Sequence, residues 1–149
     1  MMKLGAAIGL LCVLACGGNR GAEIDPSDAA GEGDDTPALA SSVGVELRSD
    51  SVRMVLHVTN PTNQPVVLEF SSGQRYDFAV RTAAGADVWR WSADKSFMQA
   101  LGSETIPPGG TLDYAEVWVP GNRTGSFIAV AELTSLNHRV REQAAFQLP

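Results

Sequence analysis

From residue 43 onward, the chain alternates apolar and polar residues in short runs that turn-forming residues separate. On Ser51–Asn60 the apolar side chains recur at every second position, as Val52, Met54, Leu56 and Val58, which places them on one face of a strand. The same period of two returns in runs near 43–48, 64–70, 75–81, 88–91, 111–119, 127–133 and 141–148. About seven to nine short strands at this spacing predict an all-β fold, an immunoglobulin-like antiparallel β-sandwich.

The stretch Phe70–Phe97 lies at the centre of this pattern and holds many of the aromatic residues. Its turn-forming residues, Ser71–Gln74 and Gly85, predict two tight reversals that join three consecutive strands. After them, Asp94–Leu101 carries Phe97, Met98 and Leu101 at the spacing of a short helical turn.

The aromatic side chains of this stretch predict where the core lies. We expect Phe78 and Trp91 to be buried partners on adjacent strands and Trp89 to face solvent, where an indole could anchor an interface. Asp77 and Arg90 alternate with these rings. Either the two side chains point separately to the solvent-exposed face of the sheet, or they form a fixed cross-strand pair that shapes a recognition surface with Trp89.

The order of motifs along this region resembles the bacterial intracellular proteinase inhibitor (BsuPI) domain family, from about residue 45 to residue 133. The resemblance implies an immunoglobulin-like sandwich and a proteinase inhibitor. It rests on Phe70, Ser72-Gly73-Gln74, Tyr76-Asp77-Phe78, Val88-Trp89-Arg90-Trp91-Ser92, Phe97, Pro108-Gly109 and Trp118.

The N-terminus has the composition of an export signal. Residues 1–15 contain one lysine followed by an apolar run, and the small residue Ala15 precedes Cys16. This resembles a lipobox and predicts an exported lipoprotein of the bacterial cell envelope, in which Cys16 carries fatty acyl groups such as palmitate. The alternative is an ordinary export signal with an incidental cysteine.

Residues 16–42 are rich in Gly, Ala, Ser, Pro and acids, which predicts a disordered acidic tether between the lipidated Cys16 and a folded domain over residues 43–149. The tether holds most of the excess negative charge of a chain whose net charge is −6. The domain lacks the basic patch that phosphate binding needs, so we expect no nucleic-acid partner.

Residues that could carry catalysis are few. Both cysteines, Cys12 and Cys16, precede the predicted domain, so the domain has neither a thiol nucleophile nor a disulfide. His57 and His138 are isolated, and no metal-binding or hydrolase motif occurs. We therefore expect no enzyme, no cofactor, no metal site and no small-molecule substrate.

Two functions remain open at this point. The resemblance implies a membrane-tethered proteinase inhibitor whose exposed loop or edge strand blocks a protease. The alternative is a non-inhibitory module that binds a protein or a glycan, or assists assembly, in the cell envelope. The first candidate binding loop is Ser71, Ser72, Gly73 and Gln74; Ser92–Ser96 and Pro120–Thr124 are the other two.

Overall fold

The computed structural model describes residues 39–149. These residues form nine strands and one short 3-10 helix. In chain order they are β1 (Ala40–Leu47), β2 (Val52–Thr59), β3 (Val66–Phe70), β4 (Tyr76–Thr82), β5 (Asp87–Arg90), η2 (Trp91–Asp94), β6 (Gly102–Ile106), β7 (Thr111–Trp118), β8 (Gly125–Leu133) and β9 (Val140–Leu148). The predicted all-β class is confirmed.

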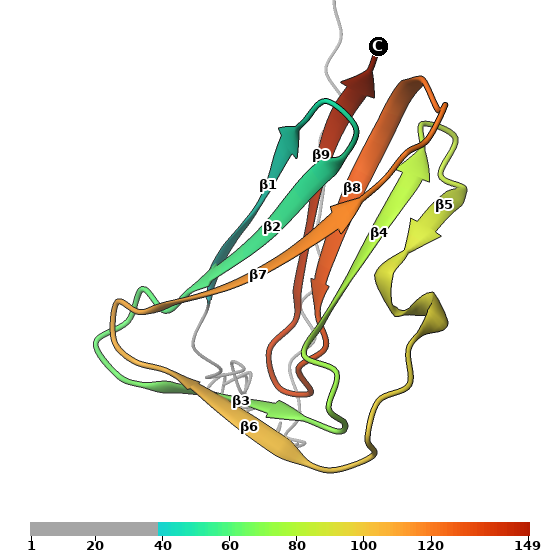
Figure 1. Cartoon of the computed structure of the whole chain (residues 1–149). Coiled ribbons are helices and arrows are strands. Elements are labelled where there is room, and N and C mark those ends of the chain that lie inside the picture. The colour runs from blue at the N-terminus through green and yellow to red at the C-terminus, as the bar shows by residue number, and fades with distance from the viewer. Residues whose placement is uncertain (1–38) are drawn as a thin grey trace, which may run out of the picture. The chain divides into compact units, whose positions relative to one another are not determined.

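The strands form three antiparallel sheets, ordered β1-β2-β7, β3-β6 and β5-β4-β8-β9. The first and third sheets are the two layers of a β-sandwich (Figure 1). Along one side, β1 approaches β9, and the Ser41 hydroxyl donates a hydrogen bond of 2.5 Å to Glu142. β8 is a central strand, between β4 and β9, and carries apolar residues on both faces.

The small sheet β3-β6 continues the ribbon of β2 and β7 around a corner (Figure 1). Asn60, which follows β2 and is fully buried, holds this corner. Its amide Nδ2 donates to the carbonyls of Gln64, Ile106 and Pro107, at 2.7, 3.0 and 3.3 Å. Its Oδ1 accepts from the Thr62 backbone at 3.0 Å. One side chain thus satisfies backbone groups of both strand connections at the bend.

The core lies between the sheets and takes its residues from the inward faces of the strands. Phe78 is fully buried and Trp118 is 3% exposed. Trp118 packs edge-on against Phe127, with ring centroids 5.5 Å apart. The buried set is Val52, Met54, Leu56, Val58, Val66, Leu68, Phe70, Phe78, Val80, Ile106, Trp118, Phe127, Ala129, Ala131, Leu133, Val140 and Leu148. The face predicted for β2, of Val52, Met54, Leu56 and Val58, agrees with this set.

The predicted hairpin at Ser71–Gln74 is wrong, although the turn itself exists. β3 pairs with β6, not with β4, so Ser71–Gln74 carries the chain from the small sheet to the large one. The second reversal is confirmed, since β4 pairs with β5 around Gly85, whose φ of 89° suits glycine.

The predicted helical turn over Asp94–Leu101 is also corrected. The only helical turn among residues 39–149 is η2, which ends at Asp94, and residues 95–101 have no regular secondary structure. Phe97 is held instead by a tertiary contact, with its ring 5.6 Å from that of Trp91.

The first strand starts at Ala40, slightly before the predicted domain boundary at residue 43. The predicted signal segment, the lipidation site Cys16 and most of the predicted tether lie outside the described residues. Within residues 39–149, no helix has the length and apolarity needed to cross a membrane.

Candidate functional site

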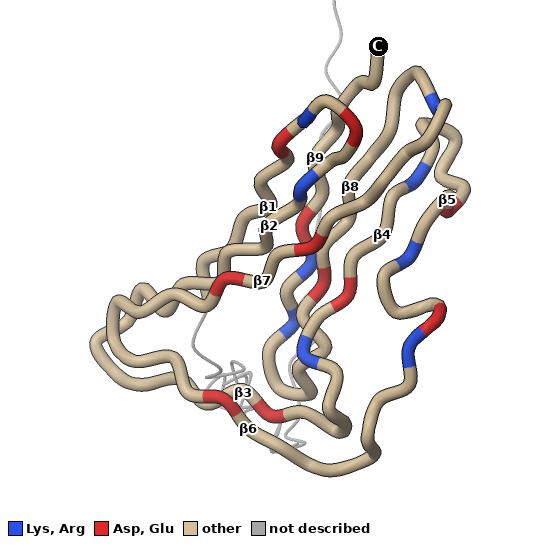
Figure 2. The backbone as a smooth tube through the Cα atoms, in the orientation of Figure 1, with Lys and Arg blue, Asp and Glu red and all other residues tan. Residues whose placement is uncertain are grey.

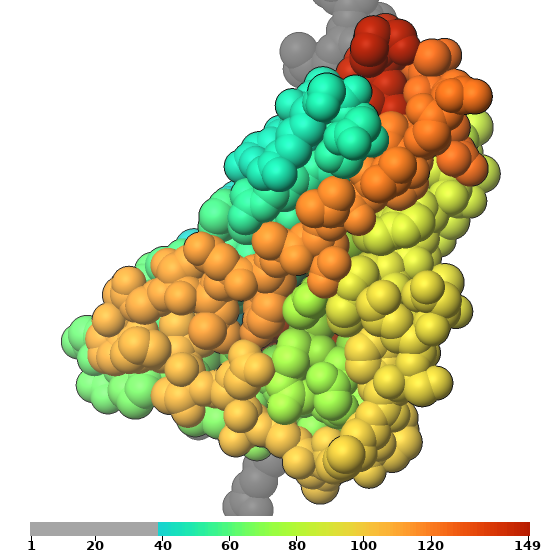
Figure 3. Space-filling model, in the orientation of Figure 1, coloured from blue at the N-terminus to red at the C-terminus, as the bar shows by residue number. Residues whose placement is uncertain are grey.

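The connection Ser71–Gln74 lies at the end of the large sheet where Tyr76 of β4 pairs with Leu133 of β8. The backbone N–H of Gly73 donates to the Met98 carbonyl at 2.8 Å, and the hydroxyl of Thr134 donates to the Gln74 carbonyl at 2.8 Å. Segments distant in sequence therefore hold the second half of this connection. In the space-filling view the yellow chain before β6 borders the yellow-green chain that leads into β4 (Figure 3).

Arg75, the residue after this connection, ties it to the small sheet. Its Nη1 donates to the Ser72 carbonyl at 2.6 Å, and its Nε donates to Glu104 of β6 at 2.9 Å. Its guanidinium carbon lies 4.5 Å from the ring centre of Phe70, within the range of a cation–π contact. The space beside Gly102 is also filled by Arg75, because a Cβ at Gly102 would lie 2.7 Å from Nη2.

Two tyrosines extend this network into the sandwich. The Tyr114 hydroxyl donates to Glu104 at 2.7 Å, and the Tyr76 hydroxyl donates to Glu116 at 2.6 Å. Burial, with the adjacent carboxylate, raises the pKa of both tyrosines well above the ordinary value, so both hydroxyls remain protonated donors. The rings of the two tyrosines are 4.7 Å apart. The loop end of the domain thus rests on a hydrogen-bonded support.

The second candidate loop, Ser92–Ser96, begins inside η2 and lies beside β4. Its first residue is fixed, because the Ser92 hydroxyl and backbone N–H both donate to Asp77, at 2.7 and 3.2 Å. Arg90 also donates to Asp77, at 2.8 Å, so the fixed cross-strand pair is present. Hydrogen bonds to Asp77 and Asp87 raise the pKa of Arg90. Figure 2 shows charged residues of both signs along β4 and β5.

The predicted recognition surface of Asp77, Trp89 and Arg90 is not assembled on one face. Asp77 is only 7% exposed, beneath Arg90. Trp89 pairs with the buried Val80 and packs against the core, so its prediction as a solvent-facing indole is corrected. Trp91 also packs there, partly buried, in the η2 turn that follows β5. Residues two apart on a strand share a face, so the prediction that placed Trp89 and Trp91 on opposite faces is wrong.

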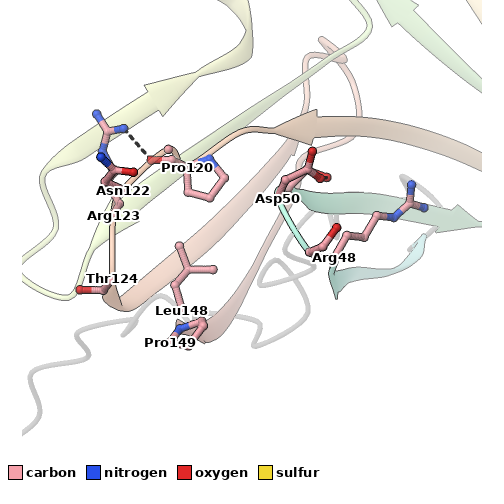
Figure 4. Close-up of a pocket in the computed structure, with 11 residues that line it drawn as sticks. Arg48, Asp50, Pro120, Asn122, Arg123, Thr124, Leu148 and Pro149 are labelled. Atoms are coloured by element: carbon pink, nitrogen blue, oxygen red, sulfur yellow. Dashed lines mark hydrogen bonds between the residues drawn. The ribbon is translucent and has the colours of Figure 1, made fainter.

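The third candidate loop, Pro120–Thr124, lies at the opposite end of the sandwich, where Thr82 of β4 pairs with Phe127 of β8. With Arg48–Ser51 and Leu148–Pro149 it lines a shallow depression (Figure 4). Arg123 bonds within the loop, donating from Nη1 to the Pro120 carbonyl at 3.0 Å. The structure therefore brings the first two candidate loops together and separates the third from them.

The two histidines lie apart from this site. His57 Nδ1 is 2.7 Å from Asp113 on the outer face of β2 and β7, and His138 is 7% exposed in the turn before β9. Within residues 39–149, no three His, Cys, Asp or Glu side chains are grouped to hold a metal.

Three residues of this region escaped prediction from the sequence as parts of a site. Arg75 reads as an outward residue of a strand, and its role depends on contacts with β6. Met98 and Leu101 read as one face of a helical turn, yet they are 78% and 85% exposed. Only the turn-forming composition of Ser71–Gln74 pointed to this end of the domain.

The sequence model of a protein family described as intracellular proteinase inhibitor, BsuPI, matches residues 39–138, more than half of the chain. The chain belongs to the BsuPI family. The match contains all three candidate loops and Arg75, and it ends before β9. The resemblance in motif order is thereby confirmed at the level of the family. No curated protein sequence matches the chain closely enough to indicate a relationship.

Solved structures share only a distant likeness with this BsuPI chain. A penta-heme cytochrome c552 from Thermochromatium tepidum aligns at 7% identity and a TM-score of 0.48, over 76% of this chain and 40% of that chain. A β-glucosidase from Kluyveromyces marxianus aligns at 8% identity and 0.42, over 75% and 14%. The PapD-like domain 7 of human CEP192 aligns at 12% identity and 0.37, over 90% and 98%. The chain thus spans less than half of the first two, and these likenesses carry no functional argument.

Proposed function

We propose that this BsuPI domain binds a protease and blocks it with two loops at one end of the sandwich. These are Ser71–Gln74 and Lys95–Leu101, which we call the paired loops. The observation that supports this most strongly is the connection of Ser71–Gln74 to the exposed segment Lys95–Leu101 through the Gly73–Met98 hydrogen bond of 2.8 Å. An exposed segment that the fold holds in place is what a protease cleft can accept. A non-enzymatic role agrees with membership in an inhibitor family.

An inhibitor loop has to be ordered before it binds, because ordering a mobile loop reduces affinity. Residues 39–149 contain no cysteine, so no disulfide orders the loops. The hydrogen bonds of Arg75 to Ser72 and Glu104, together with that of Thr134 to Gln74, supply the order instead. The proposal therefore assigns the loops rigidity that comes from tertiary contacts.

The sequence before residue 39 supports a second part of the proposal. An apolar run that ends at Cys16, followed by an acidic stretch rich in Gly and Ala, suits a lipidated anchor and a spacer. A single acyl chain binds membranes only marginally, whereas the several chains of a bacterial lipoprotein hold firmly. We propose that the inhibitor acts at a membrane of the bacterial cell envelope.

The test is an inhibition screen of the full-length protein, purified in detergent, against serine, cysteine and metalloproteases. Replacing Gly73 with leucine adds side-chain atoms next to the Met98 backbone, because a Cβ at Gly73 would lie in van der Waals contact with it, at 3.7 Å. Combined with Gln74→Ala, this change should weaken inhibition at least tenfold, about 1.4 kcal/mol. Asn122→Ala, in the loop at the opposite end, is the matched control and should leave inhibition unchanged.

If the folded, monodisperse protein inhibits no protease in the panel, the inhibitor proposal is rejected. The alternative, a tethered module that binds another envelope component, then takes its place.

A further inference from the structure

The two most exposed large apolar side chains of residues 39–149 lie on one short segment. Met98 and Leu101 are 78% and 85% exposed, and both belong to the irregular chain between η2 and β6. Single exposed leucines are ordinary on protein surfaces. Here, however, the exposed side chains stand on backbone that tertiary contacts hold in place, beside the loop that the proposed function already assigns to binding.

The backbone carbonyls distinguish Met98 from Leu101. The Met98 carbonyl accepts hydrogen bonds from Gly73 at 2.8 Å and from Ala100 at 3.0 Å, so both of its lone pairs are engaged. The Leu101 carbonyl accepts no hydrogen bond from residues 39–149. A serine or cysteine protease places the scissile carbonyl of its substrate in an oxyanion hole. Of these two exposed apolar residues, Leu101 is the one whose carbonyl can enter such a hole without breaking a backbone hydrogen bond among residues 39–149.

The peptide bond after Leu101 is supported on one side and open on the other. Gly102 begins β6 and pairs with Phe70, and the Arg75 guanidinium fills the space where its side chain would be. Since β3-β6 has two strands, the other edge of β6 has no partner strand among the described residues. An extended substrate-like chain needs this arrangement, with one edge anchored and one edge free for the enzyme.

A shallow depression adjoins this position. It is lined by Glu69, Phe70, Leu101, Gly102, Ser103 and Leu136. Leu136 is 60% exposed and is held by a hydrogen bond of 2.7 Å from its N–H to the Glu69 carbonyl. Leu101 and Leu136 thus give the surface here two exposed apolar side chains, beside the polar Glu69 and Ser103, on backbone that the fold holds.

We infer that Leu101 is the side chain that fills the specificity pocket of the target protease, with the Leu101–Gly102 bond at its catalytic group. The inference rests on the proposed function and adds the chemistry of the contact, a specificity pocket that accepts a large apolar side chain. Such pockets discriminate by the chemistry of the side chain that enters them. Met98 lies outside that pocket and contacts the enzyme surface.

The test changes which proteases the full-length protein inhibits by replacing the side chain at position 101. Leu101→Arg should weaken inhibition of chymotrypsin-type and subtilisin-type proteases about 100-fold, and it should create inhibition of trypsin, whose pocket accepts a cation. Met98→Arg is the matched control, because Met98 is exposed to a similar degree on the same segment. It should leave the preference for apolar pockets in place.

A second readout works even when inhibition is weak. Prolonged incubation with the apolar-specific protease, followed by mass spectrometry, should show hydrolysis first between Leu101 and Gly102. Inhibition that survives Leu101→Arg, a switch caused by Met98→Arg, or first cleavage elsewhere would overturn the inference while the inhibitor proposal stands. A wild-type chain that neither inhibits nor is cleaved at this bond removes both.

Discussion

Replacing Arg75 with methionine tests whether one side chain orders the paired loops. Methionine keeps an apolar stem over Phe70 but removes the donors to Ser72 and Glu104. The charge-assisted bond to the Ser72 carbonyl contributes about 1.5 to 3 kcal/mol. The Glu104 pair, whose partners are 25% and 32% exposed, adds about 0.2 to 1 kcal/mol. The free energy of unfolding should therefore fall by about 2 to 4 kcal/mol.

The expected effect on inhibition follows from the position of Arg75 beside the loops and not from its contribution to the free energy of unfolding. Without the Arg75 guanidinium, the Ser72 carbonyl loses its donor and the space beside Gly102 is no longer filled. The loops are then mobile in the free protein and lose conformational entropy when they bind, which lowers affinity. At a temperature where the variant is folded, its inhibition constant should rise at least about tenfold. Arg75→Lys keeps a charge but not the planar fork, and it should fall between wild type and Arg75→Met.

The assay pairs urea unfolding with inhibition of the most sensitive protease at 15 °C and below the unfolding midpoint. If Arg75→Met lowers stability as expected but leaves the inhibition constant unchanged, Arg75 supports the fold alone. The loops beside it would then not be the binding site.

Three further predictions concern the core, the corner and the anchor. Phe78→Ala should lower the free energy of unfolding by about 3 to 5 kcal/mol, measured in urea. Trp89→Ala and Trp91→Ala should each lower it by less, because both side chains are only partly buried, and a loss at Trp91 equal to that at Phe78 would contradict this. Asn60→Asp places a carboxylate oxygen against the carbonyls that Nδ2 contacts, which raises the pKa of the new carboxyl and costs about 3 to 5 kcal/mol at pH 7. Because a raised carboxyl pKa favours the folded state at low pH, the deficit against wild type should shrink from pH 7 to pH 4, and a deficit independent of pH would refute the argument. Cys16→Ser should release the protein from the membrane fraction, and retention there would exclude the lipid as its anchor.

The strands could be predicted from the sequence because their alternation is local. On β2, β7, β8 and β9 each side chain faces inward or outward by its position alone. The pairing of β3 with β6 could not be predicted, because it depends on a corner at which Asn60 bonds to chain far away in sequence. The turn at Ser71–Gln74 was visible in composition, but its partner strand was not.

The candidate site could be predicted only in part, because it too depends on contacts between residues distant in sequence. The spacing of Phe97, Met98 and Leu101 suits a helical turn, yet Phe97 packs on Trp91 and the Met98 carbonyl binds Gly73. These contacts outweigh a weak local preference and hold the segment in an irregular form. Likewise, nothing in the sequence near Arg75 shows that Glu104 and Gly102 lie beside it.

Hydrogen exchange of the full-length protein, with and without an inhibited protease from the panel, tests the central proposal most directly. The backbone amides of Ser71–Gln74 and of Lys95–Gly102 should exchange more slowly in the complex, while those of Pro120–Thr124 remain unchanged. Protection confined to Pro120–Thr124, or to the outer face of β1, β2 and β7, would contradict the assignment of inhibition to the paired loops.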